Sequence, residues 1–197
     1  MKTVLLIDNF DSFTWNLVQI LKQSGLCELR VVCNDQISVA DCEPFSHILF
    51  SPGPGLPSDA GITKATIEYW AATKVMLGVC LGHQAMAEVF GARLTLLPHP
   101  AHGEKTIINL LNNDGIFKGL PNQLAVGRYH SWVIDPASLP DVLKVSAVDP
   151  AGNIMAINHH GFPSFGVQFH PESILTPEGR QMIHNWLNVC SCITRLC

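Results

Sequence analysis

The chemically most distinctive residue in this 197-residue chain is Cys80, which stands between two glycines in the run GVCLG at positions 78–82. An apolar run at 75–79 leads into it, and a helical pattern follows. This is the form of a nucleophile elbow, with cysteine in place of serine. The first N–H groups of a following helix favour a thiolate and can bind an oxyanion. The pattern alone leaves open a buried structural cysteine in an ordinary turn.

A second candidate site lies far downstream, in the run FHPES at 169–173. Pro171 favours extended backbone at His170, and alternate residues of an extended chain share a face. His170 and Glu172 are therefore expected side by side, where a carboxylate orients the imidazole and supports its protonated form. The combination predicts a triad with Cys80 as nucleophile, His170 as base and acid, and Glu172 as orienting group. Taken alone, such a run would more often be a capped strand end with a surface glutamate.

A third candidate is the stiff loop SPGPG at 51–55. Its glycines allow backbone N–H groups to approach an oxyanion, and its prolines restrict the loop to few conformations. It is not a dinucleotide-binding fingerprint, because Ser58 stands where the third glycine would be and no helix begins within the motif.

These motifs need a scaffold that brings strand ends together. Apolar runs predict buried strands, and they alternate with helical patterns, of which the first is expected to be capped by Asp11 or Ser12 and to end at Gly25. The alternation predicts a three-layer α/β/α fold with a mainly parallel sheet, whose ligands bind beyond the carboxyl ends of the strands. The expected strands are 3–7, 29–33, 47–50 and 75–79, and the further helices are 37–42, 62–72 and 81–90.

The second half of the chain has short strand-like runs divided by Gly, Pro, Asn and Asp. They predict antiparallel strands, either added to the same sheet or forming a small side sheet. A last helix is expected from Thr176 to about Val189, and we expect one domain over 1–197 with a frayed tail at 190–197. The runs are 93–97, 106–111, 124–129, 132–135, 143–148, 154–158 and 165–169.

The amino-acid composition argues against several classes of function. Hydrophobic residues make up 47% of the chain and charged residues 14%, which predicts a packed core. A net charge of −4 argues against nucleic-acid binding. Apolar runs fall short of the ~20 residues that cross a bilayer, and we expect no membrane association. Seven cysteines without a C-x-x-C pair indicate a reducing, cytoplasmic setting. Pro98 and Pro100 break any helix that would bring His99 and His102 together, no third ligand is obvious, and we expect no metal site there.

In this order and spacing, the three motifs resemble those of the triad-type class I glutamine amidotransferases. The nucleophile motif extends to GVCLGHQ at 78–84. Two further segments, IDNFDSFTWNL at 7–17 and RYHS at 128–131, resemble the chorismate-using branch of that family. This branch contains the small subunits (component 2) of anthranilate synthase and aminodeoxychorismate synthase. The resemblance spans roughly residues 3–188.

The resemblance implies a mechanism and a substrate, L-glutamine. Cys80 would attack the side-chain amide, ammonia would leave with a proton from His170, and water would hydrolyse the thioester. The backbone N–H groups of Gly53 and Leu81 would stabilise the oxyanion, and no cofactor is implied in this chain. The residues implied to hold the amino-acid end of glutamine are Gly53, Pro54, Gly55, Gln84, Ser131 and Trp132.

The resemblance also implies a partner. Ammonia would pass to a chorismate-binding large synthase subunit docked over the edge that carries the motifs, in tryptophan or folate biosynthesis. The product, anthranilate, aminodeoxychorismate or both, stays open, as do the oligomeric count and feedback regulation. The chain has His102-Gly103-Glu104-Lys105 where the family usually has His-Gly-Lys, which affects the expected interface. Two alternatives are another Cys-His-Glu hydrolase of the same fold, such as a peptidase, and a catalytically silent regulatory module.

Overall fold

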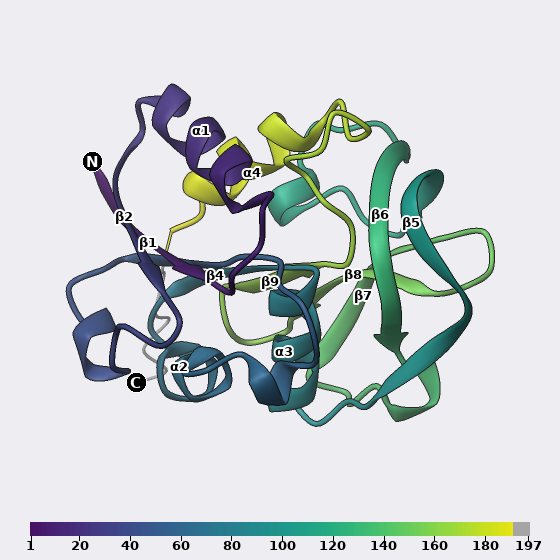
Figure 1. Cartoon of the computed structure of the whole chain (residues 1–197). Coiled ribbons are helices and arrows are strands. Elements are labelled where there is room, and N and C mark those ends of the chain that lie inside the picture. The colour runs from purple at the N-terminus through teal and green to yellow at the C-terminus, as the bar shows by residue number, and fades with distance from the viewer. Residues whose placement is uncertain (191–197) are drawn as a thin grey trace.

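A computed structural model of the chain describes residues 1–190, and these residues form a single mixed sheet with helices on both faces (Figure 1). The strand order is β2-β1-β3-β4-β9-β8-β7-β5-β6. The strands are β1 (Lys2–Asp8), β2 (Cys27–Cys33), β3 (His47–Phe50), β4 (Val75–Val79), β5 (Leu94–Leu110), β6 (Gln123–Ile134), β7 (Leu143–Val148), β8 (Ile154–His159) and β9 (Ser164–Val167). The helices are α1 (Thr14–Ser24), α2 (Thr63–Trp70), α3 (Leu81–Val89) and α4 (Gly179–Leu187).

The layers follow from the apolar runs. Helices α1 and α4 cover one face of the sheet, and α2 and α3 cover the other (Figure 1). Within β1, Val4 and Leu6 belong to the hydrophobic cluster under α1 and α4, whereas Leu5 and Ile7 belong to the cluster under α2 and α3. A parallel strand that is buried on both faces needs such an uninterrupted apolar run. The predicted three-layer α/β/α class is confirmed.

The parallel part of the sheet positions the candidate site. β2, β1, β3, β4 and β9 run in the same direction, so the loops that follow them open on one edge. β9 lies directly beside β4, with Val167 opposite Val79. Although His170 and Cys80 are far apart in the sequence, their strands are therefore hydrogen-bonded neighbours.

The antiparallel strands extend the same sheet, which decides between the two arrangements expected for the second half. The expected division into short strands at 93–97 and 106–111, and at 124–129 and 132–135, is wrong. Each pair forms one long strand, β5 or β6, and the two strands curl together (Figure 1). Pro98 and Pro100 lack an N–H and interrupt the pairing between Leu96 and Ala101, but β5 resumes beyond them.

Several helix boundaries also differ from expectation. Only a 3-10 turn, η1 (Ala40–Cys42), forms within the expected helix 37–42. Helix α1 begins at Thr14 without a side-chain cap, because the Asp11 carboxylate accepts the N–H of Phe13 instead. Helix α4 is shorter than expected at both ends. Within residues 1–190 no helix is long and apolar enough to cross a membrane. A frayed tail is predicted at 190–197, and residues 191–197 lie outside the part of the chain that the structure describes.

Candidate active site

Cys80 occupies a strained turn between β4 and α3. Its backbone has φ 51° and ψ −99°, a conformation that a non-glycine residue rarely adopts. The turn is tight because a Cβ on Gly78 would collide with the backbone of Gly82, and a Cβ on Gly82 would lie 2.7 Å from the carbonyl oxygen of Phe50. The Cys80 N–H donates to the Val167 carbonyl oxygen at 2.8 Å, which ties the turn to β9. The predicted elbow is therefore present, and steric crowding explains why positions 78 and 82 are both glycine.

His170 and Glu172 form a buried pair. The distance between His170 Nδ1 and Glu172 Oε1 is 2.6 Å, and the two side chains are 2% and 0% exposed. The backbone of His170 is held by β6, because its N–H donates to the Gly127 carbonyl oxygen at 3.0 Å. The Thr176 hydroxyl donates to the His170 carbonyl oxygen at 2.7 Å. The imidazole is thus fixed both through its ring and through its main chain.

The environment of His170 favours the charged ring. Burial lowers the pKa of His170, but interactions with the Cys80 and Glu172 side chains outweigh burial and raise the pKa from its ordinary value of 6.5 to about 10. The other ring nitrogen, Nε2, makes no hydrogen bond of good geometry within the described residues. The rings of Phe13 and Tyr129 pack edge-on against the imidazole, with centroids 5.5 and 4.9 Å away. The surroundings of His170 therefore favour its protonated form next to Cys80.

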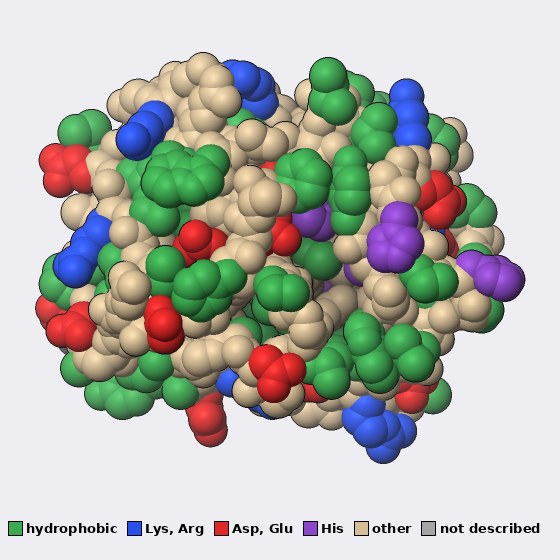
Figure 2. Space-filling model, in the orientation of Figure 1, with side chains coloured by type: hydrophobic (Ala, Val, Ile, Leu, Met, Phe, Trp, Pro, Cys, Tyr) green, Lys and Arg blue, Asp and Glu red, His purple; other side chains and the backbone are tan. Residues whose placement is uncertain are grey.

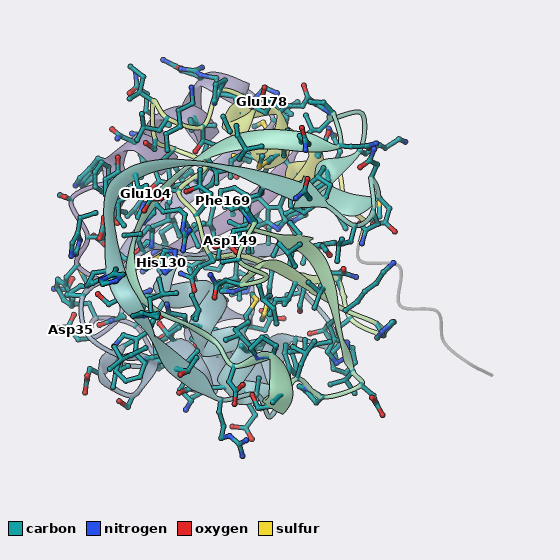
Figure 3. The ribbon with its side chains drawn as sticks, turned by 90° about the vertical axis from the view of Figure 1, so that its right-hand side faces the viewer. Asp35, Glu104, His130, Asp149, Phe169 and Glu178 are labelled. Carbon is teal, nitrogen blue, oxygen red and sulfur yellow. The ribbon has the colours of Figure 1, made fainter. Side chains whose placement is uncertain are left out.

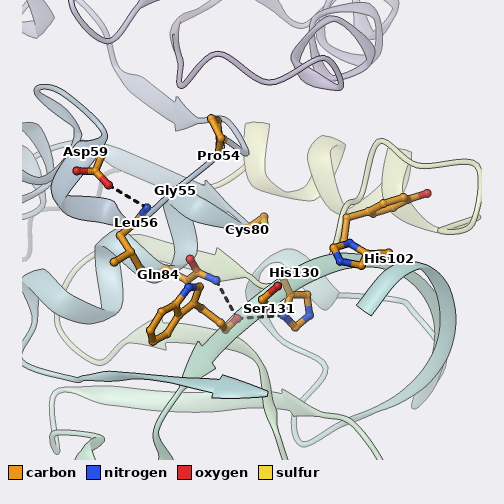
Figure 4. A pocket seen from close by; sticks show the side chains of 12 residues that line it. Pro54, Gly55, Leu56, Asp59, Cys80, Gln84, His102, His130 and Ser131 are labelled. Carbon is orange, nitrogen blue, oxygen red and sulfur yellow. Dashed lines mark hydrogen bonds between the residues drawn. The ribbon is translucent and has the colours of Figure 1, made fainter. Parts of the chain in front are cut away.

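The thiol opens into a cavity of about 530 Å³ (Figure 4). This volume falls within the range of about 300–1,000 Å³ that is typical of small-molecule sites. Figure 2 shows that the same face is hollowed between hydrophobic side chains. The sequence-predicted residues that line the cavity are Gly53, Pro54, Gly55, Cys80, Gln84, Ser131 and Trp132, and they are joined by Leu56, Asp59, His102, Tyr129 and His130. Leu81, His170 and Glu172 are not part of the lining.

Gln84 is held by the backbone of β6. Its Nε2 donates to the Trp132 carbonyl oxygen at 2.9 Å, so Trp132 contributes a main-chain atom (Figure 4). The same carbonyl oxygen lies 3.0 Å from His130 Nδ1. Arg128 Nε donates to His130 Nε2 at 3.1 Å, and since arginine can only donate, His130 must carry its proton on Nδ1. Burial, followed by the Arg128 charge, lowers the pKa of His130 to about 4.

This network continues into the body of the protein. Arg128 Nη1 pairs with Asp149 Oδ2 at 3.0 Å, and both side chains are buried. Figure 3 shows His130 and Asp149 inside the curl of the sheet, whereas Asp35 lies at the periphery. The cavity wall at Ser131 and Trp132 is thus supported by hydrogen bonds that reach the turn after β7.

Gln168 is a neighbour of the thiol that sequence reasoning missed. Its Nε2 lies 3.7 Å from Cys80 Sγ, and its Oε1 accepts from Gln84 Nε2 at 3.1 Å. The only signal was its position two residues before His170, on the same face of an extended segment. Phe13 and Tyr129 were missed as well, since nothing in their spacing indicates packing against an imidazole.

The loop after β3 is wedged against the elbow. A Cβ on Gly53 would lie 2.6 Å from both the Asn9 carbonyl oxygen and Leu81 Cδ2. Leu81 is the first residue of α3, where N–H groups lack an acceptor within the helix. The two residues predicted to form the oxyanion hole are therefore in van der Waals contact, although only Gly53 lines the cavity.

Fold and site together define an α/β protein with a Cys-His-Glu constellation at the carboxyl edge of its parallel strands. A family model described as "Glutamine amidotransferase class-I" matches residues 5–190. The chain belongs to this family, and the family expected from its motifs is confirmed.

Named relatives include both kinds of chorismate-using synthase. The chain is 46% identical over 187 residues to aminodeoxychorismate synthase component 2 of Klebsiella aerogenes, covering 94% of this chain and 99% of the relative. It is 46% identical over 192 residues to anthranilate synthase component 2 of Mycobacterium tuberculosis, covering 95% and 82%. It also matches the bifunctional protein TrpGD of Thermotoga maritima at 43% identity, but spans only 32% of that protein's length.

A solved structure from Thermoplasma acidophilum has the same fold. The protein in it is assigned as one of the subunits of a GMP synthase, and it matches this chain with 26% identity and a TM-score of 0.85. The match covers 95% of this chain and 92% of that one.

Proposed function

We propose that this chain hydrolyses L-glutamine to glutamate and delivers the ammonia to a chorismate-using synthase subunit. The observation that carries the proposal is the thiol of Cys80, which a strained backbone turn holds in the lining of a substrate-sized cavity, next to the buried His170–Glu172 pair. Family membership and the names of the relatives support the same function. Side chains and backbone groups alone account for the chemistry, and the proposal invokes no metal or cofactor.

The first half of the reaction forms a thioester. A protonated His170 next to Cys80 favours the thiolate, which attacks the side-chain carbonyl carbon of glutamine. The C–S bond forms, the carbonyl electron pair moves to oxygen, and the N–H groups of Gly53 and Leu81 stabilise that oxyanion. When the intermediate collapses, the C–N bond breaks and the nitrogen takes the proton from His170, so ammonia leaves.

The second half regenerates the thiolate. Neutral His170 accepts a proton from water as the oxygen attacks the thioester, and collapse breaks the C–S bond to release glutamate. Glu172 keeps the ring in place and stabilises its charged form in both halves. The amino-acid end of glutamine lies against Gln84, the backbone of Ser131 and Trp132, and the loop Gly53-Pro54-Gly55.

A partner is proposed on the edge that carries the cavity. Phe10 and Ile174 are 57% and 95% exposed, and they lie in the loops that follow β1 and β9. Large apolar side chains gathered on one face are typical of a protein interface. The relatives are named as second components of synthases, which supports docking of a large chorismate-binding subunit on this face. We also propose a cytoplasmic setting, because the cysteines of the described part are free thiols.

The test is the substitution Cys80→Ala. We expect glutamine-dependent ammonia release to fall by a factor of about 10³ or more, because the nucleophile is lost. Synthase activity with added ammonium and the large subunit should stay near the wild-type value. Ammonia release that survives in Cys80→Ala would overturn the mechanism.

Two further measurements separate the alternatives. A glutamine-like chloroketone should label Cys80 of the wild type, whereas a peptidase would prefer peptide substrates and a silent module would not react. Mixing the chain with the large subunits of anthranilate synthase and of aminodeoxychorismate synthase in turn, and identifying the aromatic amine that forms, assigns the product.

A further inference from the structure

Asn9 joins four segments at the edge of the sheet that carries the cavity. Its side chain is 2% exposed, and its amide groups are hydrogen-bonded on both sides. Oδ1 accepts from Asn34 Nδ2 at 3.0 Å and from Thr63 Oγ1 at 2.8 Å. Nδ2 donates to the Ser51 carbonyl oxygen at 2.9 Å. Asn9 therefore ties the end of β3 to the end of β2 and to the start of α2.

Ser51 is held by the end of β1 through every polar group that it has. Its N–H donates to the Ile7 carbonyl oxygen at 3.1 Å, and its carbonyl oxygen accepts from Asn9. Its hydroxyl oxygen accepts the backbone N–H of Asn9 at 2.8 Å. The same hydroxyl then donates to the carbonyl oxygen of Pro52 at 2.6 Å. Ser51 is fully buried, so water does not compete for these bonds.

The last of these bonds reaches the candidate oxyanion hole. The Pro52 carbonyl and the Gly53 N–H belong to one planar peptide unit, and this chain has no cis peptide bond in the described residues. In a trans peptide the N–H points away from the carbonyl oxygen. A hydrogen bond that fixes the direction of the Pro52 carbonyl therefore also fixes the direction of the Gly53 N–H. A glycine on one side of this peptide makes such a bond necessary, because glycine itself restricts its backbone little.

We propose that Ser51 and Asn9 are positioning residues for glutamine hydrolysis, which lock the Pro52–Gly53 peptide so that the Gly53 N–H faces the oxyanion. The inference rests on the proposed function. The carbonyl oxygen of Asn9 and the side chain of Leu81 pack against Gly53 where a Cβ would stand, and the Ser51 hydroxyl restrains rotation of the peptide. Both residues act on the oxyanion that develops in the transition state, and neither lines the cavity.

The decisive variant is Ser51→Ala, which removes the hydroxyl that holds the peptide. Since complete loss of an oxyanion-hole donor costs about 10²–10³ in kcat, a donor that is loosened rather than lost should cost about ten- to a hundred-fold. KM for glutamine should stay within about two-fold, because Ser51 does not line the cavity and every residue that does is retained. Alkylation of Cys80 by iodoacetamide, which needs the thiolate but no oxyanion hole, should proceed at the wild-type rate.

A second variant, Asn9→Asp, tests the same lock from the other side. It keeps both acceptor contacts to Asn34 and Thr63, but replaces the donor that faces the Ser51 carbonyl with a carboxylate oxygen that repels it. We expect the same loss in kcat with KM preserved.

The matched control is Ser46→Ala, at the opposite end of β3. The Ser46 hydroxyl also ties β3 to β1, because it donates to the Thr3 carbonyl oxygen at 3.1 Å and accepts from the Thr3 N–H at 3.2 Å. Its loss should lower the thermal midpoint about as much as Ser51→Ala but leave kcat unchanged. Three results would overturn the proposed positioning role of Ser51 and Asn9. They are wild-type kcat in both Ser51→Ala and Asn9→Asp, an equal loss of kcat in Ser46→Ala, or a change in KM alone. A wild-type chain that releases no ammonia from glutamine would instead overturn the proposed function.

Discussion

At the level of single residues, the strained turn at Cys80 positions the sulfur, and the pairing of His170 with Glu172 stabilises the charged imidazole next to it. A non-glycine residue with positive φ costs about 1–2 kcal/mol, and surrounding structure must hold it there. Here the Cys80 N–H is bonded to Val167 and the helix N-terminus begins at the next residue. The turn thus places the sulfur in the lining of the cavity, next to an imidazole whose proton is stabilised by a buried carboxylate.

Replacing Glu172 tests the role of that carboxylate. Because Glu172 raises the pKa of His170, Glu172→Gln should lower it, and NMR titration of the His170 ring should show the fall. We expect glutaminase kcat to drop by a factor of about 10²–10⁴, as for other orienting carboxylates. The matched control is Glu88→Gln, which removes a surface ion pair with Lys64 and should leave both values unchanged. An unchanged His170 titration would show that Glu172 does not support the charged ring.

Much of the site could be predicted at this scale, because its key residues lie in short motifs. Cys80, His170 and Glu172 were found that way, and the structure brings all three together. Gln168, Phe13 and Tyr129 could not be found, since their contacts depend on how β6 and the loop before α1 fold over the strand ends.

At the scale of elements, the site depends on two close approaches of backbone. Gly78 and Gly82 allow β4 and α3 to meet at the elbow, and Gly82 also allows α3 to lie against the end of β3. The oxyanion loop and the nucleophile belong to different strands, so this contact sets the distance between them.

The substitution Gly82→Ala should therefore affect both stability and reactivity. The added methyl group would meet Phe50 Cβ and its carbonyl oxygen at 2.7 Å, which forces α3 away from β3. We expect a loss of about 1–3 kcal/mol in unfolding free energy from the overpacking, measured by denaturant titration. The rate of Cys80 alkylation by a glutamine-like chloroketone should fall as well.

Gly152→Ala is the comparison, because Gly152 has φ +84° with no atom within 4 Å of an added Cβ. It should lose stability through backbone strain alone and keep the wild-type alkylation rate. Equal alkylation rates in both variants would show that the glycine contact at the elbow does not position the thiol.

The parallel half of the sheet was predictable at this scale, whereas the antiparallel half was predicted with wrong boundaries. Runs such as 3–7 and 75–79 are apolar throughout because both faces are covered, and that signal is local. Most residues of β5 are exposed or half-buried, only Ala101 and Ile108 are buried, and Pro98, Pro100 and Gly103 resemble strand ends. The pairing with β6 carries β5 past these interruptions, and such long-range pairing leaves no local pattern.

At the scale of the whole molecule, buried histidines set the response to acid. Burial lowers the pKa of His47 to about 4, of His83 to about 3 and of His130 to about 4, with charges nearby adding to each effect. In the unfolded chain a histidine titrates near 6.5. Between these values the unfolded chain binds protons that the folded chain does not, so the stability contributed by the neutral rings is present above pH 6.5 and is lost as pH falls.

We therefore expect the unfolding midpoint to fall steadily from pH 6.5 to about 4.5, a window that lies above the ordinary titration of carboxylates. Calorimetry at several pH values, or the pH dependence of the denaturant midpoint, measures it. His47→Gln should flatten the slope, because one of the three groups is removed. A midpoint that is constant between pH 7 and 5 would contradict the neutral buried rings.

The position of β9 in the sheet has a consequence for the order in which the enzyme can be assembled. β9 is made last among the strands, yet it lies between β4 and β8. A nascent chain on the ribosome thus carries its cysteine on a strand with an unpaired edge, and the histidine that would activate it has not been translated. By the proposed mechanism, an incomplete chain would not hydrolyse glutamine, and ammonia would be released only after β9 has paired with β4 and β8.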